Sequence, residues 1–118
     1  MSESYVHSVV EERLSYTAKV RGELSKDAAG AYDFRALQGG LLKYVGSLKS
    51  LLLTVPRDVL GDGFLSLYRR VGGLEPLVMR ATDVTQLLRY LDAADDAFVE
   101  IVNALFRAGI IRSVPQRP

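Results

Sequence analysis

The chain has 118 residues, of which 48% are hydrophobic and 25% are charged, with a formal net charge of +1 and no cysteine. This composition is typical of a soluble globular domain rather than a disordered chain, and the length suits one hydrophobic core. The lack of cysteine excludes disulfides and thiolate metal sites, and the small net charge falls short of the basic footprint of a dedicated nucleic-acid binder.

The first expected helix covers residues 4–24, where apolar residues such as Val6, Val10 and Leu14 recur at three- and four-residue steps. Ser8 and Glu11 fit a capping box, which offers a later start. A connection is expected at residues 25–30, which lack an apolar register.

The second expected helix covers residues 37–55, and Pro56 ends it because a proline disfavours helical geometry at the preceding residue. Six apolar residues form its seam: Leu37, Leu41, Val45, Leu48, Leu52 and Val55. Glycine costs about 1 kcal/mol relative to alanine inside a helix, so an alternative start lies after the pair Gly39-Gly40.

Two short helical pieces are expected in the middle of the chain. The first covers residues 64–71 and ends at Gly72-Gly73, since glycine is the usual residue after a helix. The second covers residues 74–81 and carries Pro76 in its first turn. A helix-turn-helix interpretation of these pieces is unattractive, because the second piece begins with apolar residues where base-contacting side chains belong.

The last expected helix covers residues 84–108 and has the strongest apolar pattern in the chain. Its seam repeats every three and four residues: Val84, Leu87, Leu91, Ala94, Phe98, Ile101 and Leu105. Asp83 with Gln86 fits a capping box, Gly109 is placed for a C-terminal cap, and Ile110 and Ile111 are expected to fold back onto the helix. Residues 112–118 are expected to form a frayed tail. The sequence therefore predicts a single all-α domain, a compact bundle of four to five helices.

A second apolar row on the last helix is formed by Leu88, Val102 and Phe106. Together with the seam, this row makes the apolar face of the helix wider than a single helix–helix seam requires. The extra apolar surface predicts self-association through the last helix, most simply as a symmetric homodimer. The alternative is that the first two long helices cover both rows within one chain.

An acidic stripe also follows the last helix, where Asp92, Asp96 and Glu100 recur every four residues with Asp95 beside them. A solvated helix face is the favoured interpretation, because exposed charges contribute little to stability. The functional interpretation is a docking strip for a basic partner, and a magnesium site ranks third.

The middle of the chain is basic, since residues 41–80 hold six Lys and Arg against three Asp and Glu. Lys43, Lys49, Arg69 and Arg70 are the candidate phosphate contacts of an alternative function, a small nucleic-acid-binding subunit. Residues 98–106 (FVEIVNALF) resemble the closing helix of small helical subunits in CRISPR effector complexes. This likeness covers under a tenth of the chain and adds only slightly to that alternative.

No catalytic, cofactor-binding or metal-ligating residues are assigned. Asp58, Asp62 and Gly63 match part of a calcium loop, but Leu60 and Arg69 stand where ligands are needed. His7, the single histidine, lies close to the N-terminus, and no hydrolase, P-loop or dinucleotide motif is present.

The leading hypothesis is a non-enzymatic protein-interaction or assembly module, with an enzyme as the third class. No secretory signal or membrane span is visible, which predicts a cytoplasmic protein. Eleven Arg against four Lys is compatible with a thermophilic source and equally with a GC-rich genome.

Overall fold

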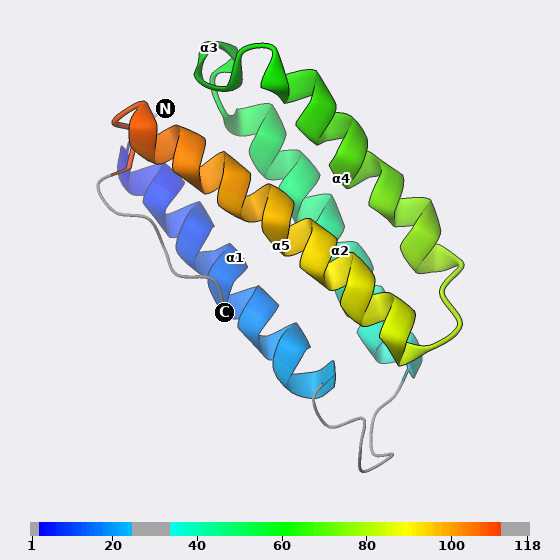
Figure 1. Cartoon of the computed structure of the whole chain (residues 1–118). Coiled ribbons are helices and arrows are strands. Elements are labelled where there is room, and N and C mark those ends of the chain that lie inside the picture. The colour runs from blue at the N-terminus through cyan, green and yellow to red at the C-terminus, as the bar shows by residue number, and fades with distance from the viewer. Residues whose placement is uncertain (1–2, 25–33, 112–118) are drawn as a thin grey trace.

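The computed structural model describes residues 3–24 and 34–111. Within these ranges the chain forms five helices and no strand: α1 (Glu3–Leu24), α2 (Phe34–Thr54), α3 (Arg57–Leu60), α4 (Gly63–Met79) and α5 (Val84–Arg107). The four long helices lie side by side, and α2 packs against each of the other three (Figure 1). The predicted all-α bundle is confirmed, whereas the expected connection at 25–30 and the tail at 112–118 lie outside the described residues.

The core is built from the two apolar seams that the sequence identifies most clearly. All seven seam residues of α5 are buried, as are the six predicted for α2, which also buries Tyr44 and Leu51. Burial of a large aliphatic side chain is worth about 1.5–3 kcal/mol, so these two seams supply most of the apolar stabilisation. They hold α5 against α2 through the centre of the bundle.

The ends of α5 follow the predicted signals closely. The Asp83 carboxylate accepts a hydrogen bond of 2.9 Å from the Gln86 amide N–H, which satisfies a backbone donor of the first turn. The Gln86 side chain bonds Thr82 rather than Asp83, so the capping box is not reciprocal. Gly109 has a φ of +76°, a conformation that glycine adopts without strain, and the chain then turns back to bury Ile111.

The prediction of two short helices in the middle of the chain is wrong. α4 continues through Gly72-Gly73 to Met79 and contains Pro76. Four buried residues form one uninterrupted stripe across the glycines: Leu67, Val71, Leu74 and Val78. Packing of this stripe onto α2 and α5 outweighs the local tendency of the glycines to end a helix. Gly72-Gly73 therefore lie inside α4 and do not form the turn that a helix-turn-helix motif requires.

The start of α2 also lies earlier than predicted, at Phe34, and the helix runs through Gly39-Gly40. The Tyr16 hydroxyl of α1 donates a hydrogen bond to the Gly40 carbonyl oxygen. A Cβ atom at Gly40 would lie 3.4 Å from that hydroxyl oxygen, so the glycine permits α1 to approach α2 closely. α1 itself begins at Glu3, upstream of the alternative start at Ser8.

Candidate functional site

The acidic run on α5 is not one solvated stripe, because Asp95 turns into the bundle and is only 1% exposed. Its carboxylate accepts a hydrogen bond of 2.8 Å from the Tyr44 hydroxyl of α2 and another from the Arg21 guanidinium of α1. Asp92 accepts a further hydrogen bond of 3.1 Å from Arg21. Asp95 thus joins three helices through polar contacts.

The charge on Arg21 balances this buried carboxylate. Desolvation by itself lowers the pKa of Arg21, but the hydrogen bonds and negative charges of Asp95 and Asp92 outweigh it and raise the pKa overall. The guanidinium therefore stays protonated at every ordinary pH. Because Asp95 is closed off from solvent and already bonded, this network stabilises the bundle rather than meeting a substrate.

The remaining predicted acidic residues lie on the outer face of α5. Glu100 forms an ion pair of 2.7 Å with Arg70 of α4. Asp96 is exposed and lines a shallow hollow with Arg70 and Leu74. Two arginines of the same chain, Arg21 and Arg70, thus engage part of the acidic stripe, which leaves less of it for an external basic partner.

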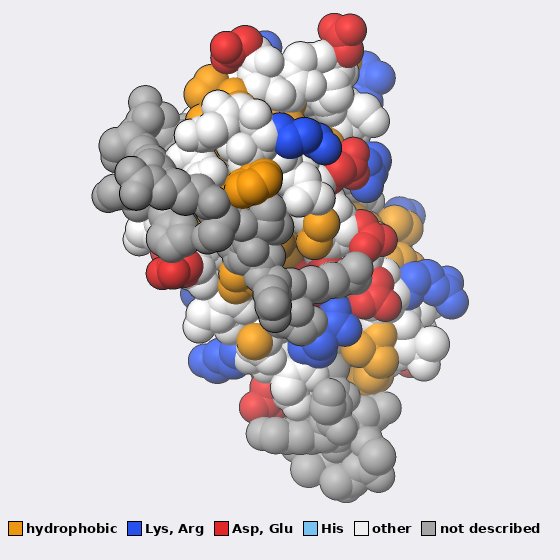
Figure 2. All heavy atoms as spheres, turned by 60° about the vertical axis from the view of Figure 1, so that its left-hand side comes forward, with side chains coloured by type: hydrophobic (Ala, Val, Ile, Leu, Met, Phe, Trp, Pro, Cys, Tyr) orange, Lys and Arg blue, Asp and Glu red, His pale blue; other side chains and the backbone are white. Residues whose placement is uncertain are grey.

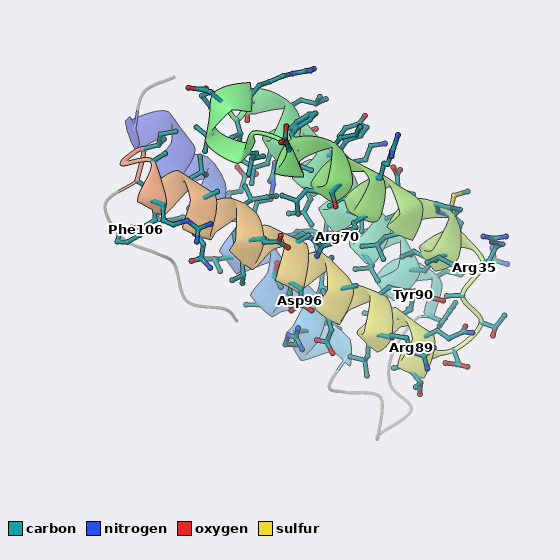
Figure 3. The ribbon with its side chains drawn as sticks, turned by 45° about the horizontal axis from the view of Figure 1, so that its top comes forward. Arg35, Arg70, Arg89, Tyr90, Asp96 and Phe106 are labelled. Carbon is teal, nitrogen blue, oxygen red and sulfur yellow. The ribbon has the colours of Figure 1, made fainter. Side chains whose placement is uncertain are left out.

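The second apolar row of α5 is largely covered within the chain. Val102 is 1% exposed, and Leu88 is partly buried against the core. Phe106, at the C-terminal end of α5, is 45% exposed (Figure 3). The structure thus supports the alternative in which neighbouring helices cover this row, and Phe106 alone of the three remains widely exposed.

The four candidate phosphate contacts differ in their surroundings. Lys49 pairs with Glu75 at 2.6 Å, and this hydrogen bond raises the pKa of Lys49. Arg70 pairs with Glu100, as described above. Lys43 lies at a hollow between α1 and α2, and Arg69 is exposed on α4. On the face shown in Figure 2, basic and acidic side chains are interspersed rather than separated by sign.

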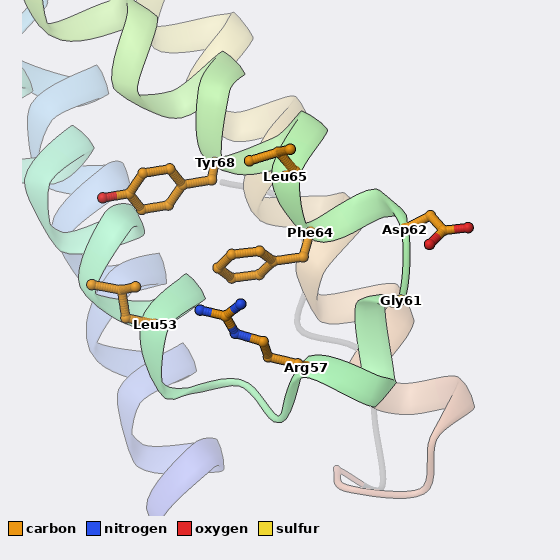
Figure 4. A pocket seen from close by; sticks show the side chains of 7 residues that line it. All are labelled: Leu53, Arg57, Gly61, Asp62, Phe64, Leu65 and Tyr68. Carbon is orange, nitrogen blue, oxygen red and sulfur yellow. The ribbon is translucent and has the colours of Figure 1, made fainter.

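A groove that the sequence did not reveal lies where α2 ends and α4 begins, and we call it the end groove (Figure 4). It has a volume of about 590 Å³, within the roughly 300–1,000 Å³ typical of binding clefts. It is lined by Leu53, Arg57, Gly61, Asp62, Phe64, Leu65 and Tyr68.

The walls of the end groove are mainly apolar. Leu53 is 62% exposed and Leu65 is 52% exposed, and the rings of Phe64 and Tyr68 stack with centroids 5.9 Å apart. The Arg57 guanidinium lies 4.9 Å from the Phe64 ring centroid, a cation–π contact. Apolar walls with one inward-facing cation are suited to binding rather than to acid–base or nucleophilic chemistry.

The described residues give no support to a metal site or to a membrane-spanning helix. Among residues 3–24 and 34–111, no group of three or more metal-ligating side chains comes together. The side chain of His7 lies outside the described part. None of the described helices has the length and apolar character needed to cross a bilayer.

Comparisons of the chain with protein-family models, with curated proteins and with solved structures give no match. The resemblance of residues 98–106 to CRISPR subunits therefore gains no support, and no function is carried over from another protein.

Proposed function

We propose that the chain is a non-enzymatic protein-interaction module that docks a partner protein in the end groove. The observation that carries this proposal is the exposure of Leu53 and Leu65, two large hydrophobic side chains that flank one hollow. Clustered apolar exposure beside a groove is typical of interaction surfaces, whereas single exposed apolar residues are ordinary. A partner that covers both leucines gains up to about 1.5–3 kcal/mol for each.

This proposal keeps the function predicted from the sequence, a protein-interaction module, but places the interaction surface at the end groove instead of on the last helix. Val102 is already buried, so the last helix offers mainly Phe106 to a partner. The end groove offers two exposed leucines and two aromatic rings. Self-association and a cytoplasmic location remain predictions within this proposal.

The nucleic-acid alternative has weaker support. Glutamates neutralise Lys49 and Arg70, so half of the candidate phosphate contacts already have an anionic partner. Phosphate binding would have to compete with these ion pairs. We therefore expect no salt-sensitive binding of labelled single-stranded RNA at about 50 mM salt.

The test is a selection of phage-displayed random peptides on the immobilised full chain. We expect selected peptides to lose at least about tenfold in affinity when Leu53→Ser and Leu65→Ser are combined. The matched control is Met79→Ser, which alters a residue that is 65% exposed and lies outside the end groove. Failure to enrich any peptide, or equal loss of affinity in the control, would contradict the proposal.

A further inference from the structure

We infer that the end groove recognises an acidic, apolar segment of a different protein, which sets a carboxylate against Arg57 and apolar side chains against Leu53 and Leu65. This inference rests on the proposed function and specifies the chemistry of the partner.

The charge of Arg57 is the basis of this inference. Its side chain is exposed, and among the described residues it has no ion-pair partner. Asp62, which also lines the groove, directs its carboxylate away from the Phe64 ring and from the Arg57 guanidinium (Figure 4). Asp58, on the same short helix α3, forms no ion pair with Arg57 either. A cation thus faces the groove without a neutralising anion.

The position of the Arg57 guanidinium suits carboxylate binding. Its contact with the Phe64 ring, 4.9 Å from the centroid, restrains the side chain at the groove. A guanidinium in contact with a ring still presents its N–H groups in its own plane, where a carboxylate accepts two of them at once. Less side-chain freedom is then lost on binding than for an unrestrained arginine.

Lys49 provides an internal comparison, because it lies 5.9 Å from the Tyr68 ring centroid at the same side of the bundle. Glu75 already accepts a hydrogen bond of 2.6 Å from its ammonium group. The anion-binding capacity of Lys49 is therefore used within the chain, and that of Arg57 is not. A ligand carboxylate would be directed to Arg57.

The same charge argues against a second copy of the chain as the occupant. A twofold interface over the groove would bring a second Arg57 towards the first, and like charges at an interface are unfavourable. A heterologous partner with a carboxylate avoids this repulsion. The widely exposed side chains of the groove are the aliphatic Leu53 and Leu65, whereas the rings of Phe64 and Tyr68 are partly buried. This favours a peptide over RNA, whose bases stack on exposed aromatic rings.

The experiment uses the peptides selected on the full chain. We expect them to carry Asp or Glu beside Leu, Ile or Phe. A synthetic selected peptide and its Glu→Gln or Asp→Asn analogue are then titrated calorimetrically into the unmodified chain and into Arg57→Gln. We expect about a tenfold loss from either change and little further loss from both together, because the two changes remove the same ion pair.

Two variants serve as controls. Arg69→Gln removes an exposed α4 arginine that does not line the groove, and we expect it to leave affinity unchanged. Arg57→Lys keeps the charge but loses the planar pair of donors, and we expect an intermediate affinity. Circular dichroism of each variant checks that the helical fold is retained.

Several results would overturn the inference. Peptides that depend on Leu53 but bind equally well to Arg57→Gln would refute carboxylate recognition and leave the docking function intact. A dimer that Leu53→Ser dissociates would identify a second copy as the occupant. Salt-sensitive RNA binding that depends on Arg57 would replace the peptide with a nucleic acid. Failure of the groove variants to affect any peptide would refute the proposed function as well.

Discussion

Replacement of Asp95 by alanine tests whether the buried polar network holds the bundle together. The substitution removes a carboxylate that is 1% exposed, and the Tyr44 hydroxyl, itself fully buried, loses the acceptor that lies 2.8 Å away. Arg21 also loses a hydrogen bond, but it keeps Asp92 and is 31% exposed.

The expected cost has two parts. A buried donor that loses its partner destabilises a fold by about 1–3 kcal/mol. The loss at Arg21 adds less than the 3–5 kcal/mol of a fully buried broken pair, since water and Asp92 remain available to the guanidinium. We expect Asp95→Ala to lower the free energy of unfolding by about 2–4 kcal/mol and the melting temperature by roughly 8–16 °C.

Urea denaturation followed by circular dichroism measures this change. Asp96→Ala is the matched control, because Asp96 is the exposed neighbour of Asp95 and its loss should cost at most about 0.5 kcal/mol. Tyr44→Phe should cost less in the Asp95→Ala background than alone, with a coupling of about 1 kcal/mol or more. Equal stabilities of Asp95→Ala and Asp96→Ala, or strict additivity with Tyr44→Phe, would refute a structural role for the network.

Three further stability measurements test other contacts. Burial raises the pKa of Tyr16, and the hydrogen bond that Lys49 donates to Glu75 raises the pKa of Lys49. The contribution of each group to stability is therefore complete below its pKa in the unfolded chain and is lost as the pH rises through its pKa in the folded chain. Urea denaturation at a series of pH values should show the free energy of unfolding falling above about pH 10. Gly73→Ala should stabilise the fold by about 0.4–1 kcal/mol, since an added Cβ meets no atom within 4 Å, and thermal melts in which it destabilises would argue against a continuous α4. Asp83→Ala should cost about 1 kcal/mol through loss of the α5 cap, and Asp83→Asn should restore most of it in the same melts.

Local patterns in the sequence were sufficient to predict α5 but not α4. In α5, the apolar seam, the Asp83 cap and Gly109 all indicate the same helix, so the boundaries agree within one residue. In α4, the glycine pair indicates an end, while the buried stripe indicates continuation. Only the packing of α4 against α2 and α5 decides between these signals, and that packing is not encoded locally.

The burial of Asp95 was missed for a similar reason. It stands among other acidic residues, and its partners Tyr44 and Arg21 lie 51 and 74 residues earlier in the chain. One signal was present: Asp95 lies seven residues after Leu88 and seven before Val102, inside the second apolar row. An acid at such a position indicates a buried partner, because an uncompensated buried charge is too costly.

The end groove was not predictable from periodicity, because its walls come from α2, α3, α4 and the turn between the last two. The triplet Leu51-Leu52-Leu53 carried a partial clue. A helix that buries two consecutive leucines turns the third towards solvent, and Leu53 is indeed 62% exposed. What the triplet does not indicate is that Leu65, twelve residues later, borders the same hollow.

The contact of Arg21 with Asp95 also determines the order in which the helices can pack while the chain is being synthesised. Ribosomes add about 5–20 residues each second, so the 74 residues between these two side chains take roughly 4–15 s to synthesise. Throughout that interval α1 exists without the acidic residues that anchor it, while α2 and α4 can already meet. α1 is therefore anchored only after α5 has been synthesised, and a nascent chain that stops before Asp92 leaves Arg21 without either of its α5 carboxylates.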